Sequence, residues 1–532
     1  MNFLLNTILL SLFSQVLSFL NCKAKETDNG FLCVCDSVYC DTTPETPKLP
    51  NKYAHSIMTS NSRPGFNADI VKFSNTEKLL NNGTVFIVNS TIVLQELRGF
   101  GGTFTDAFGL NVLSLSEKSQ DSLLRSYFGQ DGLRYRLCRV PIGGTDFSQK
   151  AYNYDNTEDD MELKHFKLAD EDFVYKIPLI KRAQILAKKK INLIASNWAP
   201  PDWMKVKTTS NSSYLKDEYY QVYADYQIRF LEEYKKRNIQ FWGITAVNEP
   251  LTGLAIHFSI NNVIMLPEQQ RKWIGHFFGP SLETRGFRDI KIMTLDDQRK
   301  YISWWMDIVM LDKEAAKYTS GIALHWYFDS HTSPEMIDEV NRKFPDKFVL
   351  YTESSINKAI SDDVINLGSW MRGALYAYNI IENLNHWSIG WIDWNMALDM
   401  TGGPSYIGQN CDAPILIDKE KDVFYKQPMY YMLGHFSAFT DEDSVVISLQ
   451  EKTPTRTRRK RAVPPWPTPV DPVPISIPKG IHGVAVQNKD GSKSIFLLNG
   501  HKHDANVTVI DVERGNLYLT LKPESMNSFI YW

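Results

Sequence analysis

The sequence lacks an excess of basic residues. It contains 58 Lys and Arg against 61 Asp and Glu, which gives a formal net charge of −3. Proteins that bind nucleic acid usually present a strongly positive surface, so the composition argues against a nucleic-acid partner. No glycine-rich phosphate loop follows the first predicted strand, which argues against a doubly wound nucleotide-binding fold. Beyond the N-terminal cysteines there is no cluster of metal ligands, and we expect neither a metal nor an organic cofactor.

Long apolar segments are absent except at the N-terminus. Residues 3–20 form a nearly continuous apolar run that resembles the hydrophobic region of a signal peptide, although no positive charge precedes it. The run is also almost long enough to span a bilayer, so a membrane anchor is the alternative. Because cysteines begin immediately afterwards, we expect a cleaved signal peptide at residues 1–20.

Cysteine is scarce beyond residue 40. Four of the six cysteines crowd near the N-terminus, at Cys22, Cys33, Cys35 and Cys40. In an exported protein this crowding is typical of two disulfides, for which the sequence alone allows three pairings, and a zinc site is the alternative. Four Asn-X-Ser/Thr triplets agree with export and are candidate glycosylation sites, namely Asn82, Asn89, Asn211 and Asn506.

Apolar runs that resemble buried strands recur from residue 97 onward. Helical periodicity follows several of them, as at residues 220–237 and 361–384. Eight such strand-and-helix units predict an α/β fold, a (β/α)8 barrel with its active site at the carboxyl ends of the strands. The runs are LRGFGG from 97, LRYRLCRVPIGG from 133, INLIAS from 191, IQFWGITAV from 239, DIKIMTL from 289, GIALHW from 321, KFVLYTE from 347 and SIGWIDW from 388.

Segments on both sides of this barrel alternate between apolar and polar residues, as antiparallel strands do. We therefore predict a barrel of residues 96–443 beside an antiparallel β-sandwich of residues 47–95 and 444–532. The alternating segments include residues 84–97, 484–498 and 517–532.

Residues 453–478 differ in composition from the rest of the chain. The basic run Arg458–Arg461 is followed by many prolines, and such a segment cannot bury a core, so we predict a disordered loop. The basic run is a candidate processing-protease site or a contact for anionic lipid. The alternative is a solvated insertion without a function.

Two glutamates stand at the ends of predicted strands. Glu249 follows the fourth run in TAVNEP, and Glu353 ends the seventh run in VLYTE. Closure of a barrel brings these strand ends to opposite sides of one mouth. Glycoside hydrolysis needs such a pair, one carboxyl group to protonate the leaving oxygen and one carboxylate to attack the anomeric carbon. Taken singly, each glutamate is more typical of a helix cap or a solvated strand end.

Aromatic and polar residues gather at the other predicted strand ends. A buried Trp is usually core packing, but several aromatic strand ends with acids and hydroxyls between them suit a pyranose, which has apolar C–H faces and hydroxyl edges. The residues are Asp146, Phe147, Trp198, His325, Tyr327 and Trp394.

These motifs resemble the animal glucosylceramidases of glycoside hydrolase family 30. The resemblance extends from about residue 22 to residue 532. It implies a small disulfide-bonded β subdomain of residues 21–46, joined by part of residues 396–427, with the pairs Cys22–Cys33 and Cys35–Cys40. The matching motifs are GFGGTFTDA from 99, SYFGQDGLRYRLCRVPIGGTDFS from 126, ASNWAPPDWMK from 195, TAVNEP from 245, LDDQR from 295, HWYFD from 325, GWIDWNMALDMTGGPSY from 390 and FYKQPMYYMLGHFSAF from 424.

The resemblance implies a retaining mechanism. Glu249 would be the acid/base, Glu353 the nucleophile that forms a glucosyl ester, and Asn248 the partner of the sugar 2-hydroxyl. In such enzymes the two carboxyl groups lie about 5–5.5 Å apart, and the acid needs a raised pKa. The substrate would also contact Asp146, Phe147, Trp198, Tyr327 and Trp394, while Arg139, Gln298, His325 and Tyr327 would order the nucleophile and the pocket floor.

The resemblance also implies a substrate and partners. The substrate would be glucosylceramide, hydrolysed to glucose and ceramide in a lysosome, at the lumenal membrane surface, or after secretion. The implied partners are a saposin-type activator protein, an anionic lipid surface and a lysosomal membrane receptor. No metal or organic cofactor is needed for this chemistry.

Some positions depart from the family pattern. Val247, Ser355 and Gln409 replace residues typical of the animal enzymes, and the loop at 251–264 matches poorly. These departures favour the alternative of a related secreted β-glycosidase or transglycosylase that acts on other glucosides, such as sterol glucosides. A non-catalytic glycolipid-binding protein is the alternative from a different class.

Overall fold

The computed structural model describes most of the chain. The predicted signal peptide lies almost wholly outside the described residues, as do the insertion at 453–478 and the glycosylation candidates Asn82 and Asn211. In the part of the chain that is described, no helix combines the length and the apolarity that a membrane crossing requires. The described residues are 19–75, 83–207, 213–254, 261–358, 360–361, 363–452 and 477–532.

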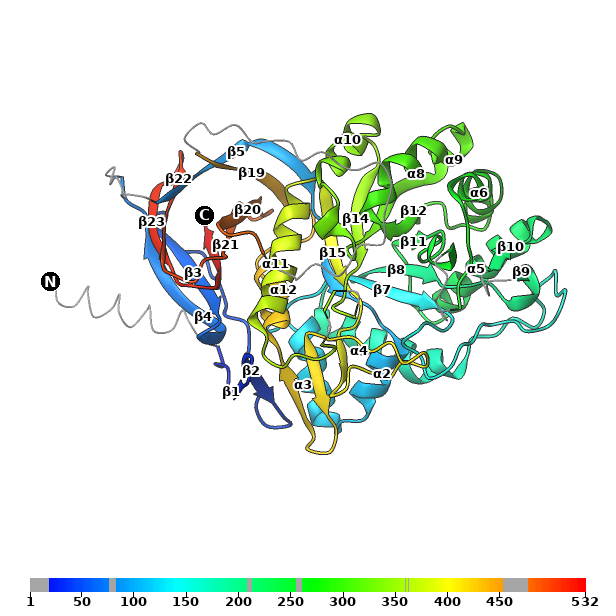
Figure 1. The fold of residues 1–532 in the computed structure, drawn as a ribbon, viewed down its shortest axis with the longest axis horizontal. Helices are drawn as coiled ribbons and strands as arrows, with labels where there is room; N and C mark the ends of the chain where they lie inside the picture. The colour runs from blue at the N-terminus through cyan, green and yellow to red at the C-terminus, as the bar shows by residue number, and fades with distance from the viewer. Residues whose placement is uncertain are drawn as a thin grey trace.

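Eight parallel strands form the central barrel (Figure 1). Their order is β6-β15-β14-β13-β12-β11-β8-β7, and a hydrogen bond from the amide of Phe104 to the carbonyl of Arg139 links the first strand to the last. All eight predicted runs are strands of this barrel. They could be recognised because both faces of a barrel strand are buried, which makes the strand a continuous apolar run. The strands are β6 (Gly99–Gly102), β7 (Leu137–Ile142), β8 (Asn192–Asn197), β11 (Gly243–Thr245), β12 (Lys291–Gln298), β13 (Thr319–His325), β14 (Phe348–Glu353) and β15 (Ser388–Asp393).

Helices cover the outside of the barrel. The predicted helix at 220–237 is α5, but the prediction of a helix from residue 361 is wrong, since α11 begins only at Trp370. Gly368 adopts a left-handed φ of +74°, which a right-handed helix cannot contain. The carbonyl of Val364 is held instead by the guanidinium of Arg372 at 2.9 Å. The helices are α2 (Asp106–Leu113), α3 (Glu117–Phe128), α4 (Ile177–Ala187), α5 (Tyr220–Lys235), α6 (Pro267–Trp273), α7 (Gly279–Thr284), α8 (Ile302–Val309), α9 (Lys313–Tyr318), α10 (Glu335–Lys343), α11 (Trp370–Leu384) and α12 (Pro428–Ser437).

A nine-stranded sheet curls beside the barrel, on the left of Figure 1, and forms the β-sandwich. Its order is β23-β22-β5-β19-β20-β21-β24-β3-β4, so strands from both ends of the chain pair with one another in it. The predicted segment 484–498 is a hairpin of two strands, because the chain turns at Gly491 with φ +83°. The strands are β3 (Tyr53–Ser60), β4 (Arg63–Lys72), β5 (Thr84–Glu96), β19 (Val445–Glu451), β20 (Ile481–Gln487), β21 (Lys493–Asn499), β22 (Ala505–Asp511), β23 (Gly515–Leu521) and β24 (Ser525–Tyr531).

Helix α12 joins the sandwich to the barrel. The rings of Phe436 in α12 and Phe496 in β21 pack with their centroids 5.0 Å apart. Both ring nitrogens of His435 contact hydroxyls of the sandwich, with Nδ1 2.7 Å from Oγ of Ser528 and Nε2 3.0 Å from Oγ1 of Thr59. Burial lowers the pKa of His435 to about 3, so this junction is held by a neutral imidazole.

A small sheet carries the two N-terminal disulfides. The bridges are Cys22–Cys33 and Cys35–Cys40, the pairing that the family resemblance implied, and the zinc alternative is therefore wrong. The sheet has the order β1-β2-β18-β17-β16 and so joins the N-terminus to a distant part of the chain. Its strands are β1 (Ala24–Thr27), β2 (Gly30–Cys35), β16 (Ala397–Asp399), β17 (Ile415–Asp418) and β18 (Val423–Lys426), and a separate hairpin is formed by β9 (Lys205–Lys207) and β10 (Ser213–Leu215).

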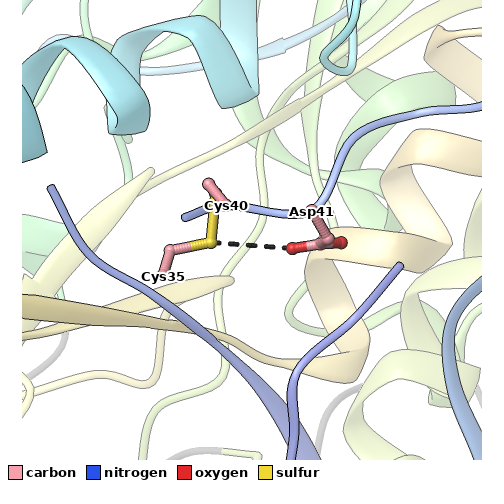
Figure 2. A group of neighbouring side chains, drawn as sticks. All are labelled: Cys35, Cys40 and Asp41. Atoms are coloured by element: carbon pink, nitrogen blue, oxygen red, sulfur yellow. Dashed lines mark hydrogen bonds between the residues drawn. A yellow bond between two sulfur atoms is a disulfide. The ribbon is translucent and has the colours of Figure 1, made fainter. Parts of the chain in front are cut away.

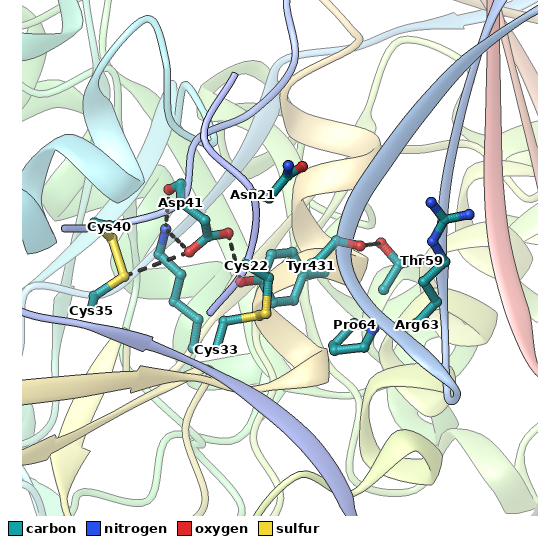
Figure 3. The surroundings of a disulfide bond; sticks show 12 residues. Asn21, Cys22, Cys33, Cys35, Cys40, Asp41, Thr59, Arg63, Pro64 and Tyr431 are labelled. Carbon is teal, nitrogen blue, oxygen red and sulfur yellow. Dashed lines mark hydrogen bonds and ion pairs between the residues drawn. A yellow bond between two sulfur atoms is a disulfide. The ribbon is translucent and has the colours of Figure 1, made fainter. Parts of the chain in front are cut away.

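A buried ion pair lies beside these disulfides. Oδ1 of Asp41 is 3.6 Å from Sγ of Cys35. Figure 2 shows the Asp41 carboxylate facing the disulfide. The same oxygen is 3.1 Å from Nζ of Lys426, and the hydroxyl of Tyr431 donates to the other carboxylate oxygen at 2.7 Å (Figure 3). The side chains of Asp41 and Lys426 are only 3% and 1% exposed. This pair therefore fastens the disulfide loop to strand β18 and helix α12.

Candidate active site

Two glutamates meet at the carboxyl ends of the barrel strands. Glu353 is the last residue of β14, and Glu249 lies four residues beyond β11. One carboxylate oxygen of each and one ring nitrogen of His325 all lie within 4.8 Å of one another. The two residues predicted as the catalytic pair are thus brought together at the mouth of the barrel.

The backbone is left-handed at three non-glycine residues of this mouth. The φ angles are +42° at Glu249, +72° at Leu295 and +58° at Asp296. Strand β12 also shifts its register against β13 between Leu295 and Asp297, which is the mark of a β-bulge. Such conformations are uncommon for these residue types and persist where the surrounding structure enforces them. The left-handed backbone and the bulge change the direction in which the side chains of Glu249 and Asp296 point.

Arg139 on β7 is fully buried and binds the nucleophile candidate. Its Nη1 donates to Oε2 of Glu353 at 2.5 Å, and its Nη2 donates to Oδ1 of Asn248 at 2.7 Å. The oxygen of the Asn248 amide is therefore occupied, whereas its NH2 group donates to none of the described residues. The hydroxyl of Tyr327 donates to the second oxygen of Glu353 at 2.8 Å, so both oxygens of this carboxylate are held.

Asp296 contacts several polar side chains of the site, and this role was not predicted from the sequence. Its Oδ2 lies 2.7 Å from Nη2 of Arg139, and its Oδ1 lies 3.1 Å from Nε2 of His325. Three hydroxyl groups also donate to this carboxylate, those of Ser196, Thr245 and Thr352. The one available signal was the matched motif LDDQR, but nothing in the sequence shows that the bulge turns Asp296 inward.

Glu249 has its own set of hydrogen-bond donors. Nδ1 of His325 lies 3.1 Å from Oε1, and Nε2 of Gln298 donates to the same oxygen at 3.2 Å. The hydroxyl of Thr252 donates to Oε2 at 2.8 Å. The family resemblance implied that Gln298 and His325 order the nucleophile and the pocket floor, and in the structure both contact Glu249. His325 is farther from Glu353, at 3.8 Å.

The ionisation of the two glutamates differs from what the sequence led us to expect. Burial raises the pKa of Glu249, but the hydrogen bond and charge of His325, together with the Thr252 hydroxyl and the charge of Arg139, leave this pKa lowered. Burial raises the pKa of Glu353, although the charges of His325 and Arg139 oppose the rise. Burial alone would lower the pKa of His325, but the charge of Glu353 and the hydrogen bonds to Asp296 and Glu249 raise it to about 10. The proton of the Glu249–His325 pair therefore lies mainly on the imidazole.

Aromatic rings line one side of the mouth. The rings of Trp198 and Trp394 stack with centroids 5.0 Å apart, and Phe147 meets Trp394 edge-on at 6.0 Å. The guanidinium carbon of Arg139 lies 4.8 Å from the ring centroid of Trp198. Asp146 is buried, and burial together with the charges of Glu353 and Glu249 raises the pKa of its carboxyl group well above the usual range. This wall offers apolar faces beside a polar edge.

The Glu249–His325–Glu353 group also has the composition of a metal site. Its three ligand atoms lie close enough together to share an ion. Two cationic groups already neutralise these carboxylates, since Arg139 binds Glu353 and the pKa of His325 is raised to about 10. A further cation would be repelled, so ion pairing explains the cluster without a metal.

Comparison with known proteins decides the family. Residues 97–440 match the model of the glycosyl hydrolase family 30 TIM-barrel domain, and residues 473–529 match the family 30 β-sandwich domain. The chain is a member of glycoside hydrolase family 30. The family 30 assignment makes it a glycoside hydrolase, which agrees with the paired glutamates at the barrel mouth.

Three similar proteins align with between 80% and 94% of this chain. The lysosomal acid glucosylceramidase of Mus musculus is 35% identical over 509 residues, which are 94% of each protein. Putative glucosylceramidase 3 of Caenorhabditis elegans is 39% identical over 433 residues, 80% of this chain and 82% of the relative. Among solved structures, SrfJ from Salmonella typhimurium superposes with a TM-score of 0.78 at 25% identity, covering 90% of this chain and 99% of SrfJ.

Proposed function

We propose that this family 30 enzyme is a retaining β-glucosidase that hydrolyses glucosylceramide to glucose and ceramide. The observation that carries the proposal is that one carboxylate oxygen of Glu249 and one of Glu353 lie within 4.8 Å of each other at the mouth of the barrel. Inverting enzymes hold their carboxyl groups about 6.5–9.5 Å apart to admit a water molecule, whereas retaining enzymes hold them about 5–5.5 Å apart. The shorter spacing supports direct attack by one carboxylate on the sugar.

Glu353 is the proposed nucleophile. Arg139 and Tyr327 hold its two oxygens, which orients the carboxylate and opposes the rise of its pKa that burial causes. In the first step, a Glu353 oxygen bonds to the anomeric carbon while the bond from that carbon to the leaving oxygen breaks. The NH2 group of Asn248 donates to the sugar 2-hydroxyl, because its carbonyl oxygen is already bound to Arg139.

Glu249 is the proposed acid/base. It protonates the leaving oxygen in the first step, and His325, Gln298 and Thr252 stabilise the carboxylate that this leaves. In the second step the Glu249 carboxylate removes a proton from water, water oxygen bonds to the anomeric carbon, and the Glu353 ester breaks. The lowered pKa of Glu249 suits the base role, and it predicts that the acid role needs an acidic medium.

The names of the relatives support a proposal for the substrate and for the cellular compartment. The mouse relative is named as a lysosomal glucosylceramidase, and the nematode relative as a putative glucosylceramidase. We therefore propose action on a β-glucoside of a sphingolipid in a lysosome-like compartment, or after secretion. A saposin-type activator, an anionic membrane surface and a lysosomal membrane receptor are proposed partners on the same ground. Asn89 and Asn506 are the proposed glycosylation sites among the described residues, and Asn506 is exposed.

Covalent labelling tests this proposal. The protein is incubated with a glucose-configured epoxide inactivator at about pH 5, digested, and analysed by mass spectrometry. One adduct on the peptide that contains Glu353 is expected, and Glu353→Gln should take up no label. Failure of folded, glycosylated protein to react would refute both the retaining mechanism and the glucose specificity.

A further inference from the structure

Lys300 follows the strand whose end contacts the proposed acid/base. It lies two residues beyond the end of β12, and Gln298, the last residue of that strand, donates to Glu249. Phe328 lies three residues beyond the end of β13, directly after Tyr327, which donates to Glu353. Lys300 and Phe328 therefore extend from the two strand ends that carry partners of both glutamates.

The Lys300 ammonium is held by aromatic rings. Its Nζ lies 3.6 Å from the ring centroid of Phe328 and 4.8 Å from that of Tyr301. Cation–π contacts of this length fix the position of the charge. Among the described residues the structure shows no hydrogen bond or ion pair to this ammonium, which has three N–H donors. Its donors therefore remain available to a ligand.

Apolar surface surrounds this charge. The side chain of Phe328 is 40% exposed, and that of Trp304, whose ring packs against Tyr301 at 6.5 Å, is 46% exposed. Exposed aromatic rings near a catalytic pair suit a hydrocarbon ligand. One cation within such a surface suits a ligand whose hydrocarbon part begins with a hydrogen-bond acceptor.

The aglycone has to pass this surface. Glu249 protonates the oxygen that joins the sugar to the aglycone, so the aglycone leaves on the side of Glu249, where Gln298, Tyr301 and Lys300 lie. The charge of Glu249 acts on the Tyr301 hydroxyl, whose pKa burial raises to about 12 together with the charges of Asp297 and Glu249. The aglycone therefore leaves toward the strand end that Lys300 follows.

We propose that Lys300 makes the enzyme select N-acylated sphingolipid glucosides over those with a free amine. An amide oxygen near the glycosidic bond accepts a hydrogen bond from Nζ, whereas a protonated amine at the same place is repelled by it. Phe328 and Trp304 then contact the start of the hydrocarbon chains. This inference rests on the proposed function, and it adds that the aglycone must carry an amide group near the glycosidic bond.

Substitution of Lys300 tests the selection. Lys300→Met keeps the length of the side chain and removes the charge and the donors, and Lys300→Arg keeps both. The variants are assayed on short-chain glucosylceramide, on glucosylsphingosine, and on an alkyl β-glucoside that has neither group. Lys291→Met is the control, since Lys291 lies exposed at the opposite end of the same strand.

Opposite changes on the two sphingolipids are expected. Lys300→Met should lower kcat/KM for glucosylceramide about tenfold and raise it severalfold for glucosylsphingosine, with the alkyl glucoside between them, and Lys300→Arg should keep the wild-type preference. Equal changes on all three substrates would show a structural role and overturn the inference.

A wild-type enzyme that cleaved only the alkyl glucoside would refute the proposed substrate. The two sphingolipids would then be compared as inhibitors of alkyl-glucoside hydrolysis. A ratio of inhibition constants that Lys300→Met leaves unchanged would overturn the role of Lys300 separately.

Discussion

Arg139 donates from Nη1 to Oε2 of Glu353 at 2.5 Å, and the guanidinium of this pair is wholly buried. Removing two charges from water is costly, and the pair recovers the cost only through further hydrogen bonds. Arg139 makes three of these, to Asn248, Asp296 and Ser196. The same side chain thus supports the fold of the barrel mouth and the orientation of the proposed nucleophile.

Arg139→Lys should reduce both activity and stability. A lysine has one ammonium and cannot serve Glu353, Asn248 and Asp296 together, so we expect kcat/KM to fall by roughly 100-fold or more. Leaving buried carboxylates without a partner should cost about 3–5 kcal/mol of the free energy of unfolding. Steady-state kinetics and thermal unfolding measure the two effects. Arg285→Lys, at a partly exposed ion pair, serves as the control. A wild-type Tm together with wild-type kinetics in Arg139→Lys would contradict this role.

His325→Phe should move the alkaline limb of the pH–rate profile. The hydrogen bond and charge of His325 lower the pKa of Glu249, so their removal should let burial raise it. Since the first step needs protonated Glu249, activity should persist to higher pH than in the wild type, although at a lower rate. The pH dependence of kcat/KM is the measurement, with His276→Gln, an exposed histidine, as the control. An unshifted limb would mean that His325 does not set the pKa of Glu249.

Asp297→Asn should stabilise the protein at neutral pH. Burial and the charge of Glu249 raise the pKa of Asp297 to about 7, from a usual value of 3.8. A raised carboxyl pKa means that the folded protein binds more protons than the unfolded one between these values, so stability falls as pH rises through this window. The gain in Tm should therefore be small at pH 4 and larger at pH 7.5, with an upper bound of roughly 4 kcal/mol. A gain that is the same at both pH values would exclude titration of Asp297 as its cause.

Asp41→Asn should destabilise the N-terminal sheet. It leaves the buried ammonium of Lys426 without its charged partner, which typically costs about 3–5 kcal/mol. The double variant Asp41→Asn with Lys426→Met removes both charges and should recover much of that loss. Thermal unfolding of the wild type, both single variants and the double variant forms a complete cycle. Simple additivity of the two single effects would show that the charges do not interact.

The barrel and the proposed catalytic pair could be predicted from the sequence for different reasons. The eight strands were visible because buried parallel strands are continuous apolar runs, as in Leu137–Ile142. Glu249 and Glu353 were found through their positions at strand ends and through the family motifs. A helix from residue 361 was predicted because its pattern is amphipathic, but the left-handed backbone at Gly368 prevents it.

The contacts between side chains across the mouth of the barrel could not be predicted from the sequence. His325 lies nearer to Glu249 than to Glu353, and the register shift between β12 and β13 lies at the same strand ends. Asp296 was missed for the same reason, since a one-residue shift of register decides which face of the strand it takes. The lowered pKa of Glu249 follows from these contacts and could not be expected without them.

The place of β24 has a consequence for the synthesis of the protein. This strand, Ser525–Tyr531, lies between β21 and β3 and is the neighbour through which the hairpin of β3 and β4 joins the rest of the sheet. The ribosome makes β3 and β4 long before β24, so the edge of β3 that pairs with β24 stays unpaired until β24 has been made. Unpaired edges are templates for aggregation. The sandwich can therefore be completed only after β24 has been made, and a chain that stops before Ser525 lacks the strand that joins β3 to the rest of the sheet.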